Sequence, residues 1–157
     1  MYKRQFILDV DGVLNDGMLY WGPTGKPFKA FGNYDHDGLK LLRSHLDIEF
    51  VSADENGFGI TYNRIVEHMK FPLTMVKEKD RLDFVLKKGD PKETIFMGDG
   101  PYDAKIMPHV GLSFAPAQAW RTAINAATYV TKREGGKGAV MDACIIIMDK
   151  MGIEHGF

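Results

Sequence analysis

Residues 6–17 read FILDVDGVLNDG, an apolar run that stops at two acids, Asp9 and Asp11. The run predicts a buried parallel strand over residues 5–10, which carries the acids to its C-terminal end, the edge at which open α/β sheets bind ligands. Side chains at positions i and i+2 of an extended chain point the same way, so both carboxylates can face one small volume. Two anions this close repel each other unless a cation lies between them, and Mg²⁺ prefers carboxylate oxygens.

The rest of the chain alternates short apolar runs with helical patterns. We expect strands over 48–52, 73–76, 94–97, 111–115 and 129–131, a β-hairpin of 18–21 and 28–31, and helices over 38–44, 56–69, 79–88, 104–109, 119–127 and 139–151. Asn56 is expected to cap the second helix. This alternation predicts an α/β fold, a single Rossmann-like domain over residues 1–157 whose parallel sheet is flanked by helices. We expect a small hairpin flap after the first strand and no separate cap domain.

Composition narrows the classes of function. The 20 basic and 21 acidic residues leave a net charge of −1, which offers no electrostatic argument for binding nucleic acid or a membrane surface. No apolar stretch approaches the roughly 20 residues of a membrane span, and the first apolar run is too short for a signal peptide. Cys144 is the only cysteine, so an intrachain disulfide is impossible and a cytoplasmic location is expected.

Polar side chains also end two further predicted strands, Ser52 on one and Asp99 on the other. If these strands lie next to the first, their polar groups meet at one edge of the sheet. Together they would form a set of residues that suits phosphoryl transfer. Asp9 would attack phosphorus and form an aspartyl-phosphate. Asp11 would protonate the leaving oxygen and then activate water. Mg²⁺, held by Asp9, the backbone carbonyl of Asp11 and Asp99, would neutralise the charge.

These residues resemble the motifs of the haloacid dehalogenase superfamily. DVDGVL at 9–14 is similar to its first motif, Ser52 to its second and GDGPYD at 98–103 to its acidic fourth. A longer pattern resembles its small capless phosphatases, typified by 3-deoxy-manno-octulosonate 8-phosphate phosphatase. This pattern comprises residues 16–17, the hairpin, Phe31, residues 35–38, 129–131 and 135–140. The resemblance implies a Rossmann-like fold, Mg²⁺ dependence and, commonly, a tetramer.

The chain departs from that pattern at two motifs. Where the family has Thr-Gly-Arg, this chain has Ser52, Ala53 and Asp54. Ser52 and Ala53 can still bind phosphate, but the charge of Asp54 should repel an acidic sugar. Gly100 replaces a second acid of the fourth motif. Asp99 is therefore expected to bind the metal directly, and Asp103 to serve the metal region through water or a basic partner.

The cation of the third motif has two candidates. Alignment with the family's Asp-Lys-Leu favours Arg81, whereas spacing to the downstream leucines equally allows Lys79. Either could steady the phosphate and the nucleophile, although arginine has a different fork geometry. Asp35, near the expected site, is a further candidate for substrate contact.

We therefore predict a Mg²⁺-dependent phosphatase that hydrolyses the phosphomonoester of a small metabolite, with a sugar phosphate as the expected class. The alternative is a non-catalytic oligomerisation or regulatory module associated with a sugar-activating enzyme, since one basic and one acidic motif residue are lost. Without a cap domain the site would be open to water. A neighbouring subunit's hairpin or C-terminal tail (153–157) could close it, so we expect a homo-oligomer, a tetramer as the resemblance implies.

Overall fold

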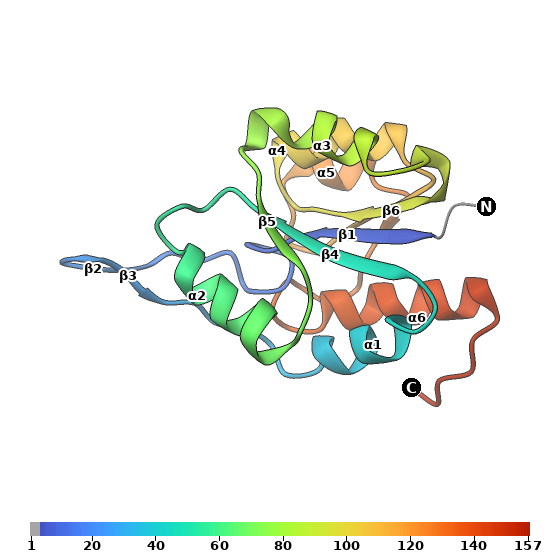
Figure 1. The fold of residues 1–157 in the computed structure, drawn as a ribbon, viewed down its shortest axis with the longest axis horizontal. Coiled ribbons are helices and arrows are strands. Elements are labelled where there is room, and N and C mark those ends of the chain that lie inside the picture. Colours follow the sequence, from blue (N-terminus) through green and yellow to red (C-terminus); the bar gives the residue numbers. More distant parts are fainter. Residues whose placement is uncertain (1–3) are drawn as a thin grey trace.

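The structure, a computed structural model, describes residues 4–157 and centres on a six-stranded parallel sheet in the order β5-β4-β1-β6-β7-β8 (Figure 1). The strands of the sheet are β1 (Gln5–Asp9), β4 (Asp47–Ser52), β5 (Leu73–Met75), β6 (Thr94–Met97), β7 (Leu112–Ala115) and β8 (Tyr129–Val130). The helices are α1 (Asp35–Leu42), α2 (Phe58–Tyr62), α3 (Arg81–Lys87), α4 (Pro101–Ile106), α5 (Arg121–Ala126) and α6 (Ala139–Met151). The α/β fold that the sequence predicts is confirmed.

Helices cover both faces of the sheet, α1 and α6 on one and α3, α4 and α5 on the other (Figure 1). Successive side chains of β1 point to opposite faces of the sheet, which explains this arrangement. Phe6 and Leu8 pack into the core with α1 and α6, whereas Ile7 packs into the opposite core. All three side chains are at most 1% exposed. Burial of each contributes roughly 1.5–3 kcal/mol, so the strand that carries the acids is held from both sides.

Strand order brings the predicted polar groups to one edge. β1 pairs in parallel with β4 on one side and β6 on the other, with Asp9 opposite Val51 and Leu8 opposite Met97. The chain fills the β4 side of the sheet first and then crosses to the β6 side. The order therefore reverses beside β1, and such a reversal is where open α/β sheets form a ligand crevice.

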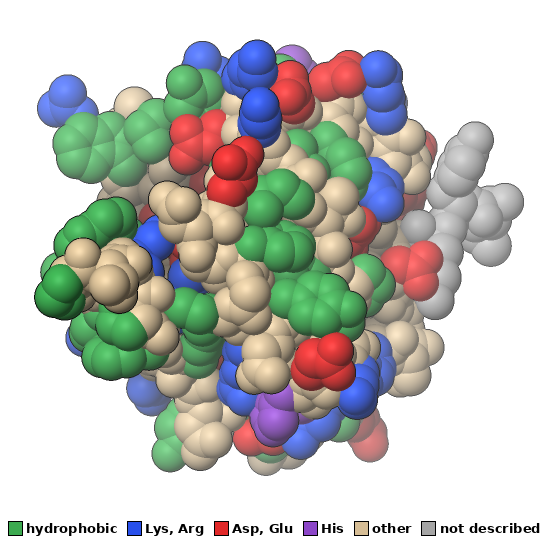
Figure 2. All heavy atoms as spheres, turned by 60° about the vertical axis from the view of Figure 1, so that its left-hand side comes forward, with side chains coloured by type: hydrophobic (Ala, Val, Ile, Leu, Met, Phe, Trp, Pro, Cys, Tyr) green, Lys and Arg blue, Asp and Glu red, His purple; other side chains and the backbone are tan. Residues whose placement is uncertain are grey.

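The hairpin consists of β2 (Tyr20–Gly22) and β3 (Gly25–Phe28) and projects from the body of the molecule (Figure 1). Its second strand was expected over 28–31. Gly22 pairs with Gly25 around a two-residue turn, and the φ of +116° at Gly25 suits glycine. Hydrophobic side chains gather over this end of the molecule (Figure 2), and four of them are more than half exposed: Met18, Leu19, Trp21 and Phe28.

Several helix boundaries also differ from expectation, including that of α1, which begins at Asp35 and not at residue 38. Asn56 caps no helix: α2 begins at Phe58 after Gly57, which offers no side-chain cap, and the chain continues as π-helix over Asn63–His68. α4 begins three residues earlier than predicted, because Pro101 has the backbone angle of a first helical turn and needs no N–H partner there. Short 3₁₀ turns occupy Glu78–Asp80, Pro91–Glu93 and Met107–His109. Among residues 4–157, no helix is long and apolar enough to cross a membrane.

Candidate active site

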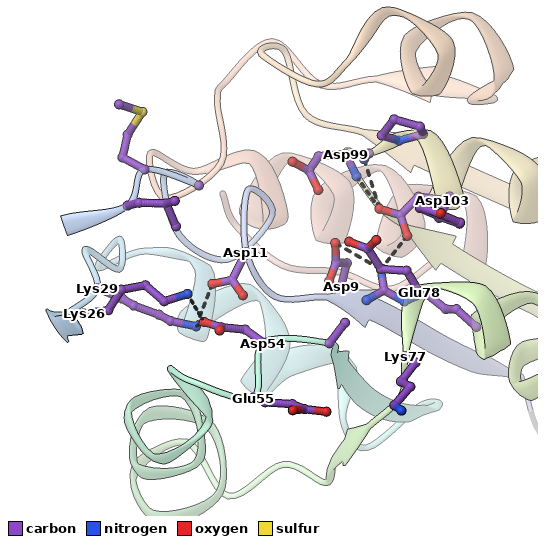
Figure 3. A pocket seen from close by; sticks show the side chains of 18 of the residues that line it. Asp9, Asp11, Lys26, Lys29, Asp54, Glu55, Lys77, Glu78, Asp99 and Asp103 are labelled. Atoms are coloured by element: carbon purple, nitrogen blue, oxygen red, sulfur yellow. Dashed lines mark hydrogen bonds and ion pairs between the residues drawn. The ribbon is translucent and has the colours of Figure 1, made fainter. Parts of the chain in front are cut away.

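A cavity of about 720 Å³ opens at the C-terminal edge of the sheet (Figure 3). The ends of β1 and β6, the loop after β4, the start of α3 and the hairpin all contribute to its wall. Seven of the residues singled out from the sequence line it: Asp9, Asp11, Ala53, Lys79, Arg81, Asp99 and Asp103. The convergence that the strand order predicts is therefore present.

Three of these acids form a compact cluster. Asp9, Asp99 and Asp103 each place one carboxylate oxygen within 4.8 Å of the others. Burial, followed by the charge of Asp103, raises the pKa of Asp9 well above its usual value. The same two causes raise the pKa of Asp99 to about 6. Burial and mutual repulsion therefore both disfavour negative charge at this point.

This donor set fits a hard divalent cation. An ion among the oxygens would replace repulsion by attraction and favour the ionised carboxylates. Gly12 makes room for the arrangement, because its φ is +83° and a Cβ atom there would overlap the carboxylate of Asp99. Gln118 secures the same loop: its Nε2 donates to the Gly12 carbonyl at 2.7 Å, and its Oε1 accepts from the Gly135 N–H at 2.7 Å.

Arg81 lies beside the acid cluster and is 3% exposed. Its Nη1 atom is 2.7 Å from Asp103 Oδ1 and 3.3 Å from Asp9 Oδ2. Burial alone would lower the pKa of the guanidinium, but Asp9 and Asp103 raise it above its usual range. Lys79 lines the cavity from its exposed rim and forms no ion pair with any residue from 4 to 157. The geometry thus favours Arg81 over Lys79 as the cation of the third motif.

Asp103 already has partners for both carboxylate oxygens. Oδ1 accepts from Arg81, and Oδ2 accepts from the backbone N–H groups of Asp99 and Gly100, each at 3.0 Å. Asp103 therefore holds Arg81 and the loop that carries Asp99. This matches the basic partner considered for it, and leaves Asp9 and Asp99 with the freer oxygens for a metal.

Asp11 faces the cavity from the hairpin side (Figure 3). Its Oδ1 atom accepts from Asn15 Nδ2 and from Lys29 Nζ, both at 2.8 Å. Asn15 also accepts from the N–H groups of Gly12 and Gly17 through its own Oδ1. Asn15 therefore folds the loop after β1 around its side chain and holds Asp11 in place.

Asp54 is not the isolated negative charge that the sequence suggests. Its Oδ2 atom is 2.7 Å from Lys26 Nζ and 2.9 Å from Lys29 Nζ, both reaching from the hairpin. Burial would raise the pKa of Asp54, but the two lysines and the N–H of Gly57 lower it to about 2. The expected repulsion of an acidic sugar is therefore offset by two neighbouring cations.

Two predicted substrate contacts lie outside the cavity wall. Ser52 ends β4 fully buried, and its Oγ accepts from the Asp54 N–H at 3.2 Å. Its role toward phosphate stays a prediction. Asp35 is 1% exposed, and its Oδ1 accepts from the Met141 N–H at 3.0 Å, in the first turn of α6. Asp35 thus satisfies a helix terminus, which corrects its expected place at the substrate.

Lys29, Asn15 and Gln118 were not predicted from the sequence as site residues. Asn15 could have been noticed, because an asparagine between two glycines is typical of a loop closed by its own side chain. Lys29 and Gln118 act across 18 and 106 residues of sequence, respectively, so no local pattern indicates them.

Comparisons with known proteins agree with this geometry. The family model described as haloacid dehalogenase-like hydrolase matches residues 81–143. A 3-deoxy-D-manno-octulosonate 8-phosphate phosphatase of Yersinia pestis is 31% identical over 160 residues, which cover 92% of this chain and 79% of the relative. A protein of the same name from Escherichia coli is 32% identical over 158 residues, covering 95% and 81%. The cobalt-bound deoxy-D-mannose-octulosonate 8-phosphate phosphatase of Haemophilus influenzae is 28% identical, with a TM-score of 0.81 over 96% of this chain and 90% of that one.

Proposed function

Because the chain belongs to the haloacid dehalogenase-like phosphatases, we propose that it hydrolyses the phosphomonoester of a small sugar through an aspartyl-phosphate on Asp9. One observation carries the proposal. Asp9 ends a central strand at the cavity, with Asp99 and Asp103 on one side and the Arg81 guanidinium 3.3 Å away. A carboxylate nucleophile next to a fixed cation is the arrangement that attack on a phosphate dianion requires.

The reaction divides into two steps. In the first, an Asp9 oxygen bonds to phosphorus while the bond to the sugar oxygen breaks, and Asp11 gives its proton to that oxygen. In the second, water attacks phosphorus and passes a proton to Asp11, and the bond to Asp9 breaks to release phosphate. Arg81 holds the nucleophile and binds phosphate oxygens throughout, and the backbone beside Ser52 and Ala53 binds the remaining oxygens.

We assign a Mg²⁺ site to the carboxylates of Asp9 and Asp99, together with the backbone carbonyl of Asp11. Support comes from the acid cluster and from the divalent ion in the Haemophilus influenzae relative. When bound, Mg²⁺ would offset the negative charge that nucleophile and phosphate share. Magnesium rather than a softer metal suits a set made only of oxygen donors.

The substrate class follows from the cavity and the relatives. A volume of about 720 Å³ accommodates a phosphorylated sugar, and the relatives are named for an acidic one. Lys26 and Lys29 offset the charge of Asp54, so an acidic sugar phosphate remains a candidate beside neutral ones. We place the enzyme in the cytoplasm, where the single buried thiol of Cys144 would stay reduced.

The alternative of a non-catalytic module is not favoured. A module released from catalysis has no need for buried acids that repel each other, because such charges cost stability. Here Asp9 and Asp103 are at most 8% exposed and share one arginine. The relatives across nearly the whole chain are also named as phosphatases.

We further propose that copies of this chain associate through the hairpin, as a tetramer. An isolated two-stranded hairpin is marginal in water, and this one exposes Leu19 and Trp21 by 66% and 65%. Met18, Leu19 and Phe28 also line the cavity, so a neighbouring subunit that covers the hairpin would shield the site from water. Sedimentation velocity of the purified chain would show a monomer if this part of the proposal is wrong.

The nucleophile is tested with Asp9→Asn and a generic aryl phosphate in the presence of Mg²⁺. We expect turnover of p-nitrophenyl phosphate to disappear while circular dichroism stays unchanged. Asp37→Asn is the matched control, since Asp37 is a half-exposed α1 residue paired with Lys40. Unchanged turnover in Asp9→Asn would remove the assignment. A panel of neutral sugar phosphates, phosphorylated sugar acids and nucleotides then identifies the substrate.

A further inference from the structure

Lys29 is the most completely engaged cation at the cavity. Its side chain is only 5% exposed. Its Nζ atom lies 2.8 Å from Asp11 Oδ1, 2.8 Å from Thr61 Oγ1 and 2.9 Å from Asp54 Oδ2. Two of these contacts, to Asp11 and Thr61, are hydrogen bonds that the ammonium group donates, and the contact with Asp54 is an ion pair. Lys29 is therefore bound by three side chains of its own subunit.

Lys26 provides the contrast on the same hairpin. Among residues 4–157, its Nζ atom has one acidic partner, Asp54 Oδ2 at 2.7 Å, and it does not reach Asp11. Lys26 lies in β3 and Lys29 directly after it, and both contact Asp54, but only Lys29 touches the predicted general acid. Figure 3 shows both side chains converging on Asp54, with Asp11 beside Lys29.

The contacts of Lys29 also orient Asp11. Asp11 Oδ1 is occupied by Lys29 and Asn15, while its Oδ2 has no donor within the described chain. Holding one oxygen from two sides leaves the other to exchange the proton with the reacting oxygens. Gly57 permits the close approach, since a Cβ atom there would overlap Asp54 Oδ2 and lie 2.7 Å from Lys29 Cε.

We propose that Lys29 is a positioning residue: held by Asp54 and Thr61, it fixes the carboxyl of Asp11 so that Oδ2 faces the leaving oxygen. This inference rests on the proposed function, in which Asp11 donates a proton as the ester bond breaks. The hairpin thereby becomes part of the catalytic apparatus of its own subunit. Its closure onto Asp54 and Thr61 is what brings the ammonium group to Asp11.

The test uses leaving groups of increasing basicity: p-nitrophenyl, phenyl and benzyl phosphate. A strongly basic leaving oxygen needs its proton during bond cleavage, whereas p-nitrophenolate leaves without one. The ratio kcat/KM covers the steps up to that cleavage. We expect Lys29→Met to lower kcat/KM for benzyl phosphate roughly 10–100-fold more than for p-nitrophenyl phosphate, part of the total effect of a general acid.

Two companion variants keep the test decisive if Lys29→Met folds poorly. Thr61→Val keeps the shape of the side chain but removes one acceptor of Lys29, and should steepen the same dependence by a smaller factor. Lys26→Met is the matched control, because it breaks the ion pair between hairpin and Asp54 but leaves both donors of Asp11 in place. Its ratio of benzyl to p-nitrophenyl kcat/KM should equal that of the unmodified chain.

The outcomes separate the inference from the proposed function. Suppose that Asp11→Asn steepens the leaving-group dependence, but Lys29→Met and Thr61→Val lower kcat/KM by the same factor for all three esters. Lys29 is then merely structural, and the inference is overturned. If Asp11→Asn itself lowers kcat/KM by the same factor for all three esters, Asp11 is not the general acid and the proposed mechanism fails first. A steeper leaving-group dependence in Asp11→Asn, Lys29→Met and Thr61→Val supports both the proposed mechanism and the positioning role of Lys29.

Discussion

Replacing Asp35 with asparagine should change how stability depends on pH. The side chain is 1% exposed and joins α1 to the first turn of α6 through its bond to the Met141 N–H. The second oxygen, Oδ2, is buried and has no partner within residues 4–157. Burial raises the pKa of this carboxyl from 3.8 to about 6, although the N–H groups of Met141 and Val140 pull the other way.

The sign and size follow from this shift. A raised pKa means that the folded state binds the proton more tightly than the unfolded chain does. The stabilising contribution is therefore complete below pH 3.8 and is lost as the pH rises through about 6. A difference of about two pH units corresponds to roughly 3 kcal/mol, and asparagine loses nothing because it cannot ionise. Relative to the unmodified chain, the free energy of unfolding of Asp35→Asn should thus rise by roughly 3 kcal/mol between acidic and neutral pH.

Urea unfolding followed by tryptophan fluorescence at several pH values measures this difference directly. Asp99, whose pKa is also about 6, titrates in both proteins and cancels from the comparison. The absolute stability of the variant is less informative, since the new amide group is left without an acceptor, at a cost of about 1–3 kcal/mol. Two parallel curves of unfolding free energy against pH would mean that burial does not raise the pKa of Asp35.

Three further perturbations test the site and the hairpin. Arg81→Met should cost roughly 3–5 kcal/mol at neutral pH, because it leaves two buried carboxylates without their cation. Urea unfolding should show a smaller deficit in acid, because burial raises the pKa of Asp9 and favours its neutral form there. Mg²⁺ should raise the melting temperature of the unmodified chain, and Asp99→Asn should abolish that shift in calorimetry; a shift that persists would place the ion elsewhere. Gly12→Ala should also abolish the Mg²⁺-dependent rise in melting temperature, because the φ of +83° and the Asp99 carboxylate leave no room for a methyl group.

Local signals account for what could be predicted. The apolar runs that became β1 and β6 end in acids, and parallel pairing of neighbouring strands brings Asp9 and Asp99 together without further information. The last helix, α6, has the bounds that the sequence predicts, because the αL glycines Gly138 and Gly152 flank it.

The features that could not be predicted from the sequence depend on contacts between side chains far apart in the chain. Whether Asp54 repels or attracts depends on Lys26 and Lys29, which reach it only once the hairpin folds back. The choice between Arg81 and Lys79 depends on a 3₁₀ turn over Glu78–Asp80, after which Arg81 begins α3 pointing inward. The position of Asp35 depends on how α6 docks, which no segment near α1 encodes.

The cavity is lined by two kinds of segment, the central strands of the sheet at its floor and the projecting hairpin at its wall. The floor belongs to central strands buried on both faces, whereas Phe28 contacts the same space from β3, and Met18 and Leu19 contact it from the segment before β2. Residues that shape the cavity wall can thus be changed without altering the strands that carry Asp9 and Asp99. Grafting residues 18–28 from a relative should redirect the preference among phosphate esters, and Lys29 marks the border beyond which such an exchange would begin to impair the chemistry itself.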